Sequence, residues 1–394
     1  GTRGTQRYTP TNVSLPAGKT AVSISTSGTY GETMCAVLDD GTLYCWGDNQ
    51  YGNIGIGTNC ESSSYINGCN GEYGISTPSK VSLPTDRTAT AVSAGNEHTC
   101  AILDDGSVWC WGRNQYGELG VGNSSSSGDW RYSPNAVMMP SGVTAVGLSL
   151  GDAHSCMVVS DGRIFCWGHN NAHQIGDGTG YNRNIPTQVY GTASYVSVSS
   201  GPQFNCAITD LGTVQCWGLN NYEQLGLGYN GNYDYSTPQN TALPAGIEAS
   251  SLALGSEHDC AVMETMSVYC WGFDDYGQLN TEYECQSDFT NGCSGDGRST
   301  PAPAQLPTGR GGIAAIAGYH YTCVFINNGG VYCFGQNGHG QLGNGTTGTY
   351  GPTYVGMPVG ISPQTNDRDL DHDGVFNNEA VSYTHLTLPT NREV

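Results

Sequence analysis

Basic residues are scarce in this sequence. Lysine and arginine together number 13, against 34 aspartates and glutamates, and only Lys19 and Lys80 are lysines. The formal net charge of −21 would repel a phosphate backbone, so we expect no nucleic-acid partner. Charged residues make up only 12% of the chain whereas glycine occurs 58 times, a composition that favours tight turns between short buried strands over disorder.

Long apolar runs are also absent. No run approaches the roughly 18 residues that a membrane helix needs, and we therefore expect no membrane insertion. The sequence has no initiator methionine and no signal peptide, so the lack of an export signal carries no information about export. Residues 1–15 align with residues 345–357, which leads us to expect a fragment that begins in the middle of a repeat.

One short pattern occurs six times. Each copy has two cysteines ten residues apart, a turn signal between them and a final Trp-Gly or Phe-Gly, as in CAILDDGSVWCWG at residues 100–112. The first cysteines of successive copies lie 65, 56, 50, 54 and 63 residues apart. This recurrence indicates an internal repeat, and single residues are best interpreted within it.

Each repeat contains four short β-prone segments separated by Gly- and Pro-rich turns. In the second copy these segments are residues 90–95, 98–103, 107–112 and 133–140. Four such segments predict a four-stranded antiparallel sheet, and six sheets in series predict an all-β fold, a β-propeller that spans residues 1–360.

The segments that end each repeat outnumber the hairpins. Pro-x-x-Val-type segments occur seven times, whereas the two-cysteine hairpin occurs six times. The first of these segments, residues 9–16, would then be the outer strand of a blade whose other strands precede it. We therefore expect six complete blades plus part of a seventh, with a gap where the seventh blade should stand.

The turn between the two cysteines predicts that they face each other. If residues 104–106 form a three-residue hairpin loop with glycine in the left-handed region, Cys100 lies directly opposite Cys110. Opposed Cα atoms on neighbouring strands are about 4.5–5.5 Å apart, within disulfide range. Six cross-strand disulfides are expected: Cys35 with Cys45, Cys100 with Cys110, Cys156 with Cys166, Cys206 with Cys216, Cys260 with Cys270, and Cys323 with Cys333.

The remaining four cysteines occupy equivalent loop insertions in the first and fifth repeats. We expect two further disulfides there, Cys60 with Cys69 and Cys285 with Cys293. Zinc is the alternative for so many cysteines, but the C-x-x-C knuckles of structural zinc sites are missing from the sequence. A chain with eight local disulfides is expected to work outside the cytoplasm, in the extracellular space or at the cell surface.

The full repeat pattern resembles that of a known family. G-x-x-H-x-C followed by D-G-x-V-x-C-W-G-x-N-x-x-G-x-L-G-x-G is similar to the regulator of chromosome condensation repeat, and the similarity covers about 90% of the chain. Members of that family form seven-bladed propellers and include a nuclear exchange factor for a small GTPase, a plant ultraviolet photoreceptor and a secreted inhibitor of β-lactamases. The resemblance therefore implies a fold more than a single function.

Two repeats depart from this pattern. Met266 stands where the other hairpins have the turn glycine, so this turn is expected to differ, because methionine resists a positive φ. Phe334 replaces the tryptophan of the sixth repeat. The expected disulfides and the acidic charge disfavour a nuclear role, and five of the seven tryptophans occupy the repeat position, which disfavours photoreception by a tryptophan cluster.

Candidate catalytic residues fit structural roles better. Four histidines precede the first cysteine of their repeats by two or three residues: His98, His154, His258 and His320. Because they are distributed over different blades, we interpret them as structural hydrogen-bonding groups. The sequence GLSLG at residues 147–151 matches the nucleophile elbow of esterases, yet Ser149 aligns with inner-strand residues of the preceding repeat. We therefore expect no enzymatic activity and no cofactor for the propeller.

Variable loops are the stronger candidates for function. Residues 123–133 and 229–236 and the two cysteine-bearing insertions occupy the same repeat position, so they should share one rim. Tyr, Ser, Gly and Asn predominate in them, a composition typical of adaptable binding surfaces on a rigid scaffold. The candidate binding residues are Trp130, Tyr132, Tyr233 and Tyr235.

The repeat pattern stops after residue 360. Residues 361–381 form an acidic linker whose alternating aspartates are similar to the start of an EF-hand or thrombospondin-type calcium loop. The expected calcium ligands are Asp369, Asp371, Asp373 and Glu379. Ala380 stands at the twelfth loop position, where glutamate would close an EF-hand, so a merely solvated linker is the alternative. Residues 382–394 resemble neither module and are expected to be translated vector sequence.

These features predict a non-enzymatic scaffold that binds a protein or a glycan outside the cytoplasm. Two alternatives stay open. One is a secreted enzyme or enzyme inhibitor with a site on the propeller rim. The other is a structural spacer within a larger surface protein.

Overall fold

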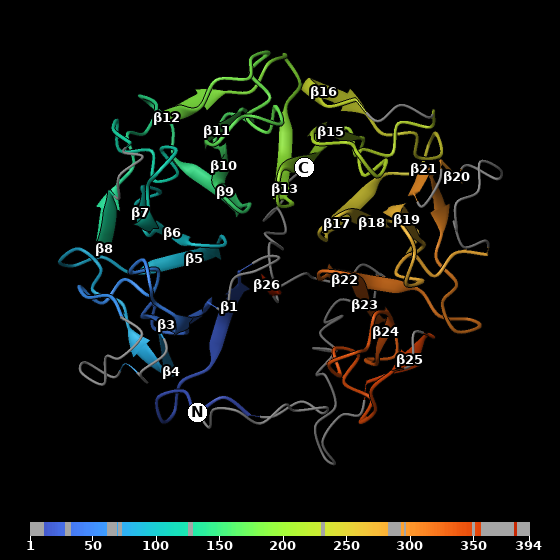
Figure 1. Ribbon diagram of the computed structural model, residues 1–394, viewed down its shortest axis with the longest axis horizontal. Helices are drawn as coiled ribbons and strands as arrows, with labels where there is room; N and C mark the ends of the chain where they lie inside the picture. Colours follow the sequence, from blue (N-terminus) through green and yellow to red (C-terminus); the bar gives the residue numbers. More distant parts are fainter. Residues whose placement is uncertain are drawn as a thin grey trace, which may run out of the picture.

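Six β-sheets surround a central axis in the computed structural model of the chain (Figure 1). The structure describes residues 12–27, 33–60, 69, 73–124, 129–229, 233–282, 293–294, 297–348, 351–355 and 382–383. Within these residues the regular secondary structure consists of strands alone, and neighbouring strands of each blade pair antiparallel. The expected all-β propeller is confirmed.

Each blade is built from four strands that follow one another from the axis outward. Blade 1 contains β1 (Ala21–Thr26), β2 (Thr33–Leu38), β3 (Leu43–Asp48) and β4 (Gly74–Lys80). Blade 2 contains β5 (Ala89–Ala94), β6 (His98–Leu103), β7 (Val108–Arg113) and β8 (Trp130–Ala136). Blade 3 contains β9 (Ala145–Leu150), β10 (His154–Val159), β11 (Ile164–Gly168) and β12 (Arg183–Gln188).

The other three blades repeat this order. Blade 4 contains β13 (Tyr195–Ser200), β14 (Phe204–Thr209), β15 (Val214–Gly218) and β16 (Tyr235–Asn240). Blade 5 contains β17 (Ala249–Leu254), β18 (His258–Met263), β19 (Val268–Phe273) and β21 (Gly297–Pro303), with the short β20 (Cys293–Ser294) outside β21. Blade 6 contains β22 (Gly312–Ala317), β23 (Tyr321–Ile326), β24 (Val331–Gly335) and β25 (Thr353–Tyr354). The short β26 (Ser382–Tyr383), in the tail excluded from the fold prediction, pairs parallel with β1.

The turn between the second and third strands has the expected three-residue form. In blade 2, Leu103 N donates to Ser107 O at 2.9 Å and Gly106 N donates to Leu103 O at 2.8 Å. Gly106 has φ 74°, and a Cβ there would lie 2.4 Å from the Cβ of Thr144 in the next blade. Glycine is thus required both by the backbone conformation and by the close approach of the neighbouring blade.

The turn of blade 5 keeps the same geometry despite its methionine. Met266 adopts φ 63°, and its amide donates to Met263 O at 2.7 Å, as the glycine amide does in other blades. The expectation that this turn differs from the others is therefore wrong. The surrounding hydrogen bonds hold Met266 in the left-handed region, at a cost in backbone strain, and its side chain is exposed to solvent.

The strand register places the two cysteines of every repeat opposite each other. The six expected cross-strand disulfides are all present, with Cα atoms 4.0–4.1 Å apart. The loop disulfide between Cys60 and Cys69 is also confirmed, with Cα atoms 5.6 Å apart. Cys285 lies outside the described residues, so its pairing with Cys293 stays a prediction. The repeated disulfides lie in the core, where the cysteines of the first five blades are fully buried.

The hydrophobic core lies between blades rather than within them. One cluster, for example, combines Val37 and Leu43 of blade 1 with Leu103 and Trp111 of blade 2. A single four-stranded sheet has two faces to cover, so each blade needs a neighbour on both sides. The propeller ring meets this need for successive blades.

The repeat tryptophans join each blade to the preceding one. Trp167 Nε1 donates to the backbone oxygen of Glu118 at 2.7 Å, and Trp217 Nε1 donates to that of Gln174 at 3.1 Å. Trp111 and Trp271 make the same bond, and all four indoles are fully buried. In blade 6 Phe334 has no donor, and among the described residues only the second-strand side chain bonds to this oxygen: Thr322 Oγ1 donates to Gln278 O at 2.8 Å, as Thr99, Ser155 and Asn205 do beside the tryptophan in blades 2 to 4.

Among the described residues, the series of blades is open between blade 6 and blade 1 (Figure 1). Innermost strands of successive blades pack together from β1 to β22, and no comparable contact joins β22 to β1 among the described residues. Trp46, at the open side of blade 1, is partly exposed and donates no hydrogen bond within the described part of the chain. These observations support the expected gap in part.

The proposed outer strand at residues 9–16 is not seen. Residues 12–16 belong to no strand, and residues 9–11 lie outside the described part of the chain. Cys333 pairs with Thr353 of β25, so blade 6 has its own outer strand. Six complete blades are confirmed, and the seventh blade stays a prediction.

Candidate binding face

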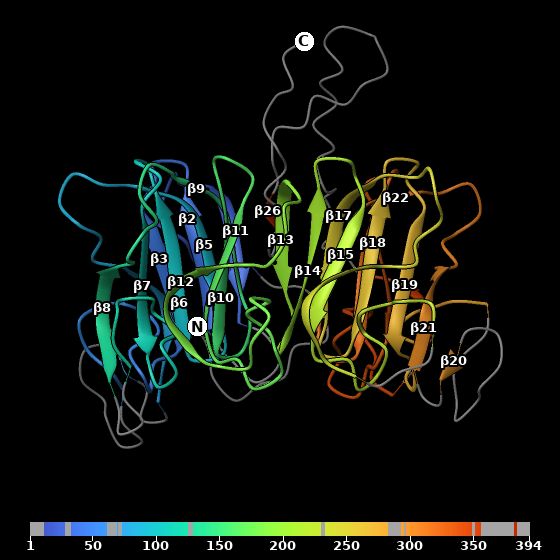
Figure 2. The same ribbon diagram turned by 90° about the horizontal axis from the view of Figure 1, so that it is seen from above.

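The third strand of every blade ends, and the fourth begins, at the same end of the ring (Figure 2). Because successive strands alternate in direction, the turns between the first and second strands lie at the same end. This end is termed the loop face, and the opposite end, which carries the β-hairpin turns, is termed the hairpin face. The single rim expected for the variable loops is confirmed for the described residues.

A buried polar side chain at the start of each of these loops binds backbone groups of the described residues. In blade 2, Asn114 Oδ1 accepts a hydrogen bond from Leu119 N at 3.2 Å, and Asn114 Nδ2 donates to Asn123 O and to Asp129 Oδ2, both at 2.9 Å. The equivalent bond to a leucine or isoleucine amide is made by Asn49, Asn170, Asn220, Asp274 and Asn337. These side-chain bonds satisfy backbone groups in the described part of each loop and hold that part in one conformation.

Aromatic side chains of the loop face pack across blade boundaries. Tyr116 of blade 2 stacks on His169 of blade 3, with ring centroids 4.2 Å apart. Tyr222 of blade 4 meets Phe273 of blade 5 edge to face at 5.1 Å. Tyr276 of blade 5 stacks on His320 of blade 6, with ring centroids 4.8 Å apart. The repeat thus places a series of aromatic rings around the loop face.

A cluster of Tyr51, Arg113 and Trp130 lies where blades 1 and 2 meet on this face. The guanidinium of Arg113 lies over the ring of Tyr51, 5.4 Å from its centroid, and Trp130 contacts the same ring edge to face at 5.3 Å. Glu97 pairs with Arg113 and fixes its orientation. Trp130 is 41% exposed, so this cluster offers a large aromatic surface next to a held cation.

The predicted binding residues form two separate groups. Trp130 and Tyr132 lie at the start of β8, where Tyr132 O accepts a hydrogen bond from Gly57 N at 2.8 Å. Tyr233 is 74% exposed in blade 4, and Tyr235 shares a hydrogen bond of 2.8 Å with Tyr229. That bond is the largest cause that raises the pKa of Tyr235 to about 12. Blade 3 separates the two groups.

Sequence reasoning missed the partners of these residues. Tyr51 and Arg113 belong to the repeat pattern itself, so nothing in a single repeat marks them as functional. They could have been found by comparing successive repeats. The tyrosine in the loop of one blade contacts the residue that follows Trp-Gly in the next blade, as Tyr51 contacts Arg113.

Two carboxyl groups near the loop face have displaced pKa values. Burial raises the pKa of Glu118 to about 7, although its Oε2 accepts a hydrogen bond from Tyr116 N at 2.7 Å. Burial, followed by the nearby charge of Glu97, raises the pKa of Asp152 to about 6. In blades 3 to 6 the side-chain oxygen of a glutamine accepts the same bond from the amide two residues earlier. Glu118 is therefore a structural residue of the repeat, with a carboxyl group where the other blades have an amide.

The histidines hold blades together, as expected from the sequence. His98 Nε2 lies 2.9 Å from Ser155 Oγ, and His154 Nε2 lies 3.0 Å from Asn205 Oδ1, in each case across a boundary. Burial lowers the pKa of His98 to about 3 and that of His154 to about 4, so both rings are neutral at pH 7. His320 packs among the loop-face aromatics instead.

Ser149 is a structural residue. It is fully buried, and its Oγ accepts a hydrogen bond of 2.8 Å from the amide of Ser200 in the next blade. An esterase nucleophile needs an exposed hydroxyl at a sharp turn, whereas Ser149 lies inside the strand β9. The elbow-like sequence therefore has no catalytic meaning here.

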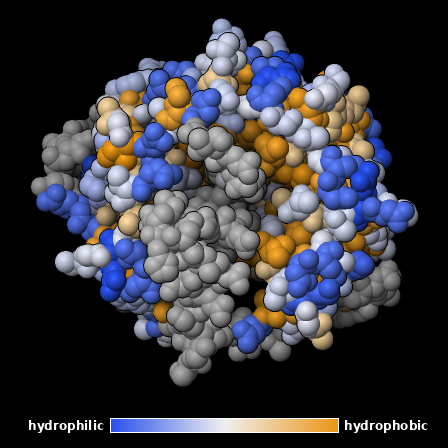
Figure 3. Space-filling view, turned by 180° about the vertical axis from the view of Figure 1, so that it is seen from behind, coloured by the Kyte–Doolittle hydropathy of each residue, from blue (hydrophilic) through white to orange (hydrophobic). Residues whose placement is uncertain are grey.

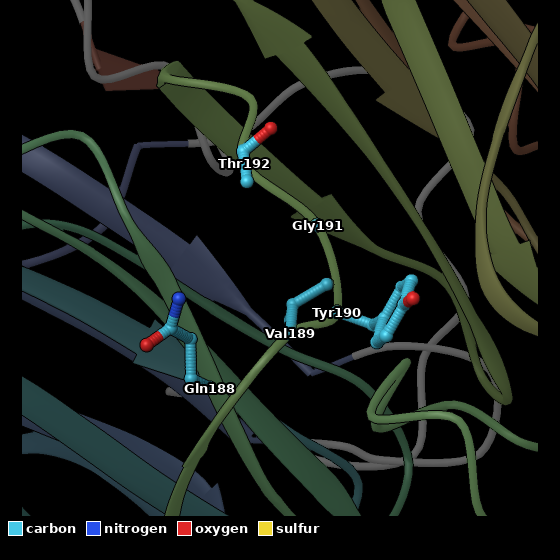
Figure 4. Close-up of a pocket in the computed structure, with 5 residues that line it drawn as sticks. All are labelled: Gln188, Val189, Tyr190, Gly191 and Thr192. Atoms are coloured by element: carbon cyan, nitrogen blue, oxygen red, sulfur yellow. The ribbon is translucent and has the colours of Figure 1, made fainter.

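A hollow on the surface of blade 3 is shallow and built from a single segment (Figure 4). It has a volume of about 580 Å³ and is lined by residues 188–192, which connect β12 to β13. Ligand and active sites gather polar groups from several elements, and this hollow does not. It is a surface feature of blade 3 rather than a candidate site.

The hairpin face carries apolar and hydrophilic residues intermixed over its coloured part (Figure 3).

The described residues of the whole chain contain no group of three or more potential metal ligands. They also contain no helix long and apolar enough to cross a membrane. The expected calcium ligands, Asp369, Asp371, Asp373 and Glu379, lie outside the described residues.

Curated relatives share the propeller rather than the whole chain. Human HERC2, an E3 ubiquitin-protein ligase, is 28% identical over 320 residues, which are 80% of this chain but 6% of that protein. The ultraviolet-B receptor UVR8 of Arabidopsis thaliana is 26% identical over 86% of this chain and 70% of the receptor. This chain therefore spans only a small part of the first of these relatives.

Solved structures and the family comparison agree on the fold. Human WBSCR16 superimposes with a TM-score of 0.73 at 20% identity, covering 89% of this chain and 85% of that one. Yeast RCC1 (Prp20) superimposes with a TM-score of 0.70 at 22% identity, covering 85% and 74%. The family model of the RCC1-like domain matches residues 1–367. The chain therefore belongs to the RCC1-like domain family.

Proposed function

We propose that this chain is a non-enzymatic scaffold that works outside the cytoplasm and presents its loop face to a protein or a glycan. Domains of the RCC1-like family act in protein binding or regulation, which supports the general class. The seven disulfides of the described residues support an oxidising compartment, because cytosolic thiols are kept reduced.

The cluster of Tyr51, Arg113 and Trp130 carries the proposal. Aromatic residues and arginine are the side chains most enriched at the energetic centres of binding surfaces. Here the three groups hold one another in place through a cation–π and an edge-to-face contact, so little conformational entropy is lost when a partner binds. The exposed ring of Trp130 also suits the apolar face of a sugar.

The alternatives make different predictions about this cluster. A secreted enzyme would need titratable groups from several blades around a pocket, whereas the hollow lined by residues 188–192 is built from one segment. A spacer would bind nothing through the loop face. An inhibitor of a secreted enzyme, the other form of this alternative, would also bind its target through the propeller rim.

The test is a binding screen of the folded chain against a glycan array and a panel of secreted proteins. Any ligand found should lose at least about tenfold in affinity when Trp130→Ala removes the exposed ring of the cluster. Tyr190→Ala is the matched control, because Tyr190 is 67% exposed but lies between β12 and β13, outside the loop face. Equal effects of the two substitutions would contradict a site at this cluster.

Calcium binding by the acidic segment is a separate proposal. It rests only on the spacing of Asp369, Asp371 and Asp373 in the sequence, and the propeller needs no cofactor. A calcium site there would fit an extracellular chain, since extracellular calcium-binding modules work with weak sites.

A further inference from the structure

Two kinds of hydrogen bond join neighbouring blades close to the axis. In the first, a serine Oγ of one innermost strand accepts an amide of the next: Ser25 from Ala94 (3.0 Å), Ser93 from Leu150 (3.1 Å) and Ser149 from Ser200 (2.8 Å). In the second, a histidine Nε2 meets a polar side chain of the next blade: His98 with Ser155 (2.9 Å), His154 with Asn205 (3.0 Å) and His258 with Thr322 (2.9 Å). Four of the five boundaries carry at least one of these bonds.

The boundary between blades 4 and 5 carries neither. Phe204 occupies the histidine position of blade 4, so no ring nitrogen reaches blade 5. Ser199 occupies the serine position, yet its Oγ receives no hydrogen bond from Leu254 N, the amide equivalent to those of Ala94 and Ser200. The two innermost strands, β13 and β17, also approach each other over a shorter stretch than any other successive pair.

Pro202 removes another donor from the same boundary. At the equivalent position, Asp152 N donates to Pro202 O at 3.2 Å and Ser256 N donates to Gly318 O at 3.3 Å, each across a boundary. Proline has no amide hydrogen, so blade 4 cannot make this bond to blade 5. The sequence GPQF at residues 201–204 therefore lacks both donors that the corresponding GDAH at residues 151–154 supplies.

Asp259 is a buried polar group that the boundary leaves unsatisfied. It occupies the position of Ser155, Asn205 and Thr322, which all bond to the preceding blade. The Asp259 side chain is fully buried, and neither of its oxygens has a hydrogen-bond partner in the described structure. Burial raises its pKa well above the usual range, and the nearby indole of Trp271 opposes this shift only in part. A buried group of this kind weakens the packing around it.

The outer part and the hairpin-face end of the same boundary keep their bonds. Gly228 N donates to Ser299 O of the outer strand β21 at 2.8 Å, and Ala249 N, at the hairpin-face end of β17, donates to Gly212 O at 2.9 Å. The indole of Trp271 donates to a backbone oxygen of blade 4, as the repeat tryptophans do in other blades. Near the axis at the loop-face end, by contrast, the contact depends on apolar packing around Phe204, which is non-directional and tolerates sliding.

We propose that the ring opens at this boundary, with blades 1 to 4 and blades 5 and 6 separating near the axis while the outer hydrogen bonds serve as the hinge. The contact between Tyr222 and Phe273 on the loop face spans the boundary. Opening therefore changes the spacing of the two loops that carry these rings. A partner that contacts both loops would favour one of the two states.

Hydrogen exchange of the full chain, resolved to single amides, tests this inference. In the unmodified protein the amide of Leu254 should exchange at least about tenfold faster than the equivalent amides of Ala94, Leu150 and Ser200. The double substitution Phe204→His with Asp259→Thr recreates the pair of His258 and Thr322 at the weak boundary. It should slow exchange in β13 and β17 by about fivefold, the effect of one added hydrogen bond.

The opposite double substitution, at the boundary of blades 5 and 6, is the matched control. His258→Phe with Thr322→Asp transfers the weak pair to the boundary of blades 5 and 6 and should accelerate exchange in β22. If the variant Phe204→His with Asp259→Thr does not fold, a second variant is Asp259→Asn. It places at this position the amide found at Asn205 and should still slow hydrogen exchange in β17. The inference would be overturned by equal hydrogen exchange rates at all boundaries of the unmodified protein. It would also be overturned if the variant Phe204→His with Asp259→Thr folds but its exchange rates in β13 and β17 are unchanged.

Discussion

The indole Nε1 of Trp167 donates a hydrogen bond of 2.7 Å to the backbone oxygen of Glu118 in the preceding blade. This relationship recurs at successive boundaries and explains why the repeat carries tryptophan directly after the second cysteine. Trp46 is the exception, because the open side of blade 1 offers its indole no acceptor among the described residues.

We therefore expect Trp167→Phe to lower the free energy of unfolding by about 1–3 kcal/mol, through the lost bond and the smaller ring. Trp46→Phe should cost clearly less, since its indole is partly exposed and makes no such bond within the described chain. Denaturant unfolding of both variants measures the difference. Equal losses would show that the bond to the preceding blade contributes nothing.

The repeated disulfides should resist reduction in the folded chain. The cysteines of blades 1 to 5 are fully buried, so a thiolate reaches them only when the blade opens. Peptide mapping without reductant should find the six repeated pairs and Cys60 with Cys69, and it will also test Cys285 with Cys293. Each ten-residue loop should contribute roughly 2–3 kcal/mol. Free thiols in a repeated pair of oxidised material would contradict the mapping prediction.

The buried histidines predict destabilisation by acid. The folded pKa of His98 is about 3, below the ordinary value of 6.5, so the unfolded chain binds the proton first as the pH falls. The stability that depends on neutral His98 is thus complete above about pH 6.5 and lost progressively towards pH 3.

Replacing this histidine measures its share of the acid effect. His98→Phe introduces the residue that blade 4 carries at the same position, Phe204, and should remove about 2 kcal/mol of the loss between pH 7 and pH 5. Unfolding curves at the two pH values provide the measurement. An unchanged difference between them would refute this role.

Glu118 predicts the opposite pH dependence. Its folded pKa of about 7 lies above the ordinary value of 4.5, so its contribution is complete below about pH 4.5 and lost as the pH rises through 7. Glu118→Gln should therefore stabilise the chain by about 1–3 kcal/mol at pH 8 and have little effect at pH 4. Gln174→Glu is the reverse control and should destabilise at pH 8. A Glu118→Gln variant that is no more stable at pH 8 would argue that Arg113 fully compensates the charge.

Calcium binding can be tested without reference to the propeller. Calorimetric titration of the chain with calcium should show heat that Asp371→Ala reduces several-fold, because an aspartate at that loop position is a direct ligand in similar loops. Absence of heat at millimolar calcium would leave residues 361–381 as a solvated acidic linker.

Much of the architecture could be predicted from the sequence because the repeat is local. A turn glycine such as Gly106 and two cysteines ten residues apart determine a hairpin register by themselves, and six copies at similar spacing determine six similar blades. Even the structural role of Ser149 followed from its alignment with other inner strands. Each of these inferences needs only the strand period, the turn geometry and the repeat.

The candidate site and the weak boundary were decided by the tertiary structure. The approach of Arg113 and Trp130 to Tyr51 joins side chains more than 60 residues apart, and only closure of one blade against the next brings them together. Phe204 and Asp259 look like ordinary substitutions within their own repeats. Their effect emerges only when blades 4 and 5 are placed side by side, because a hydrogen bond between repeats requires the right residue in both.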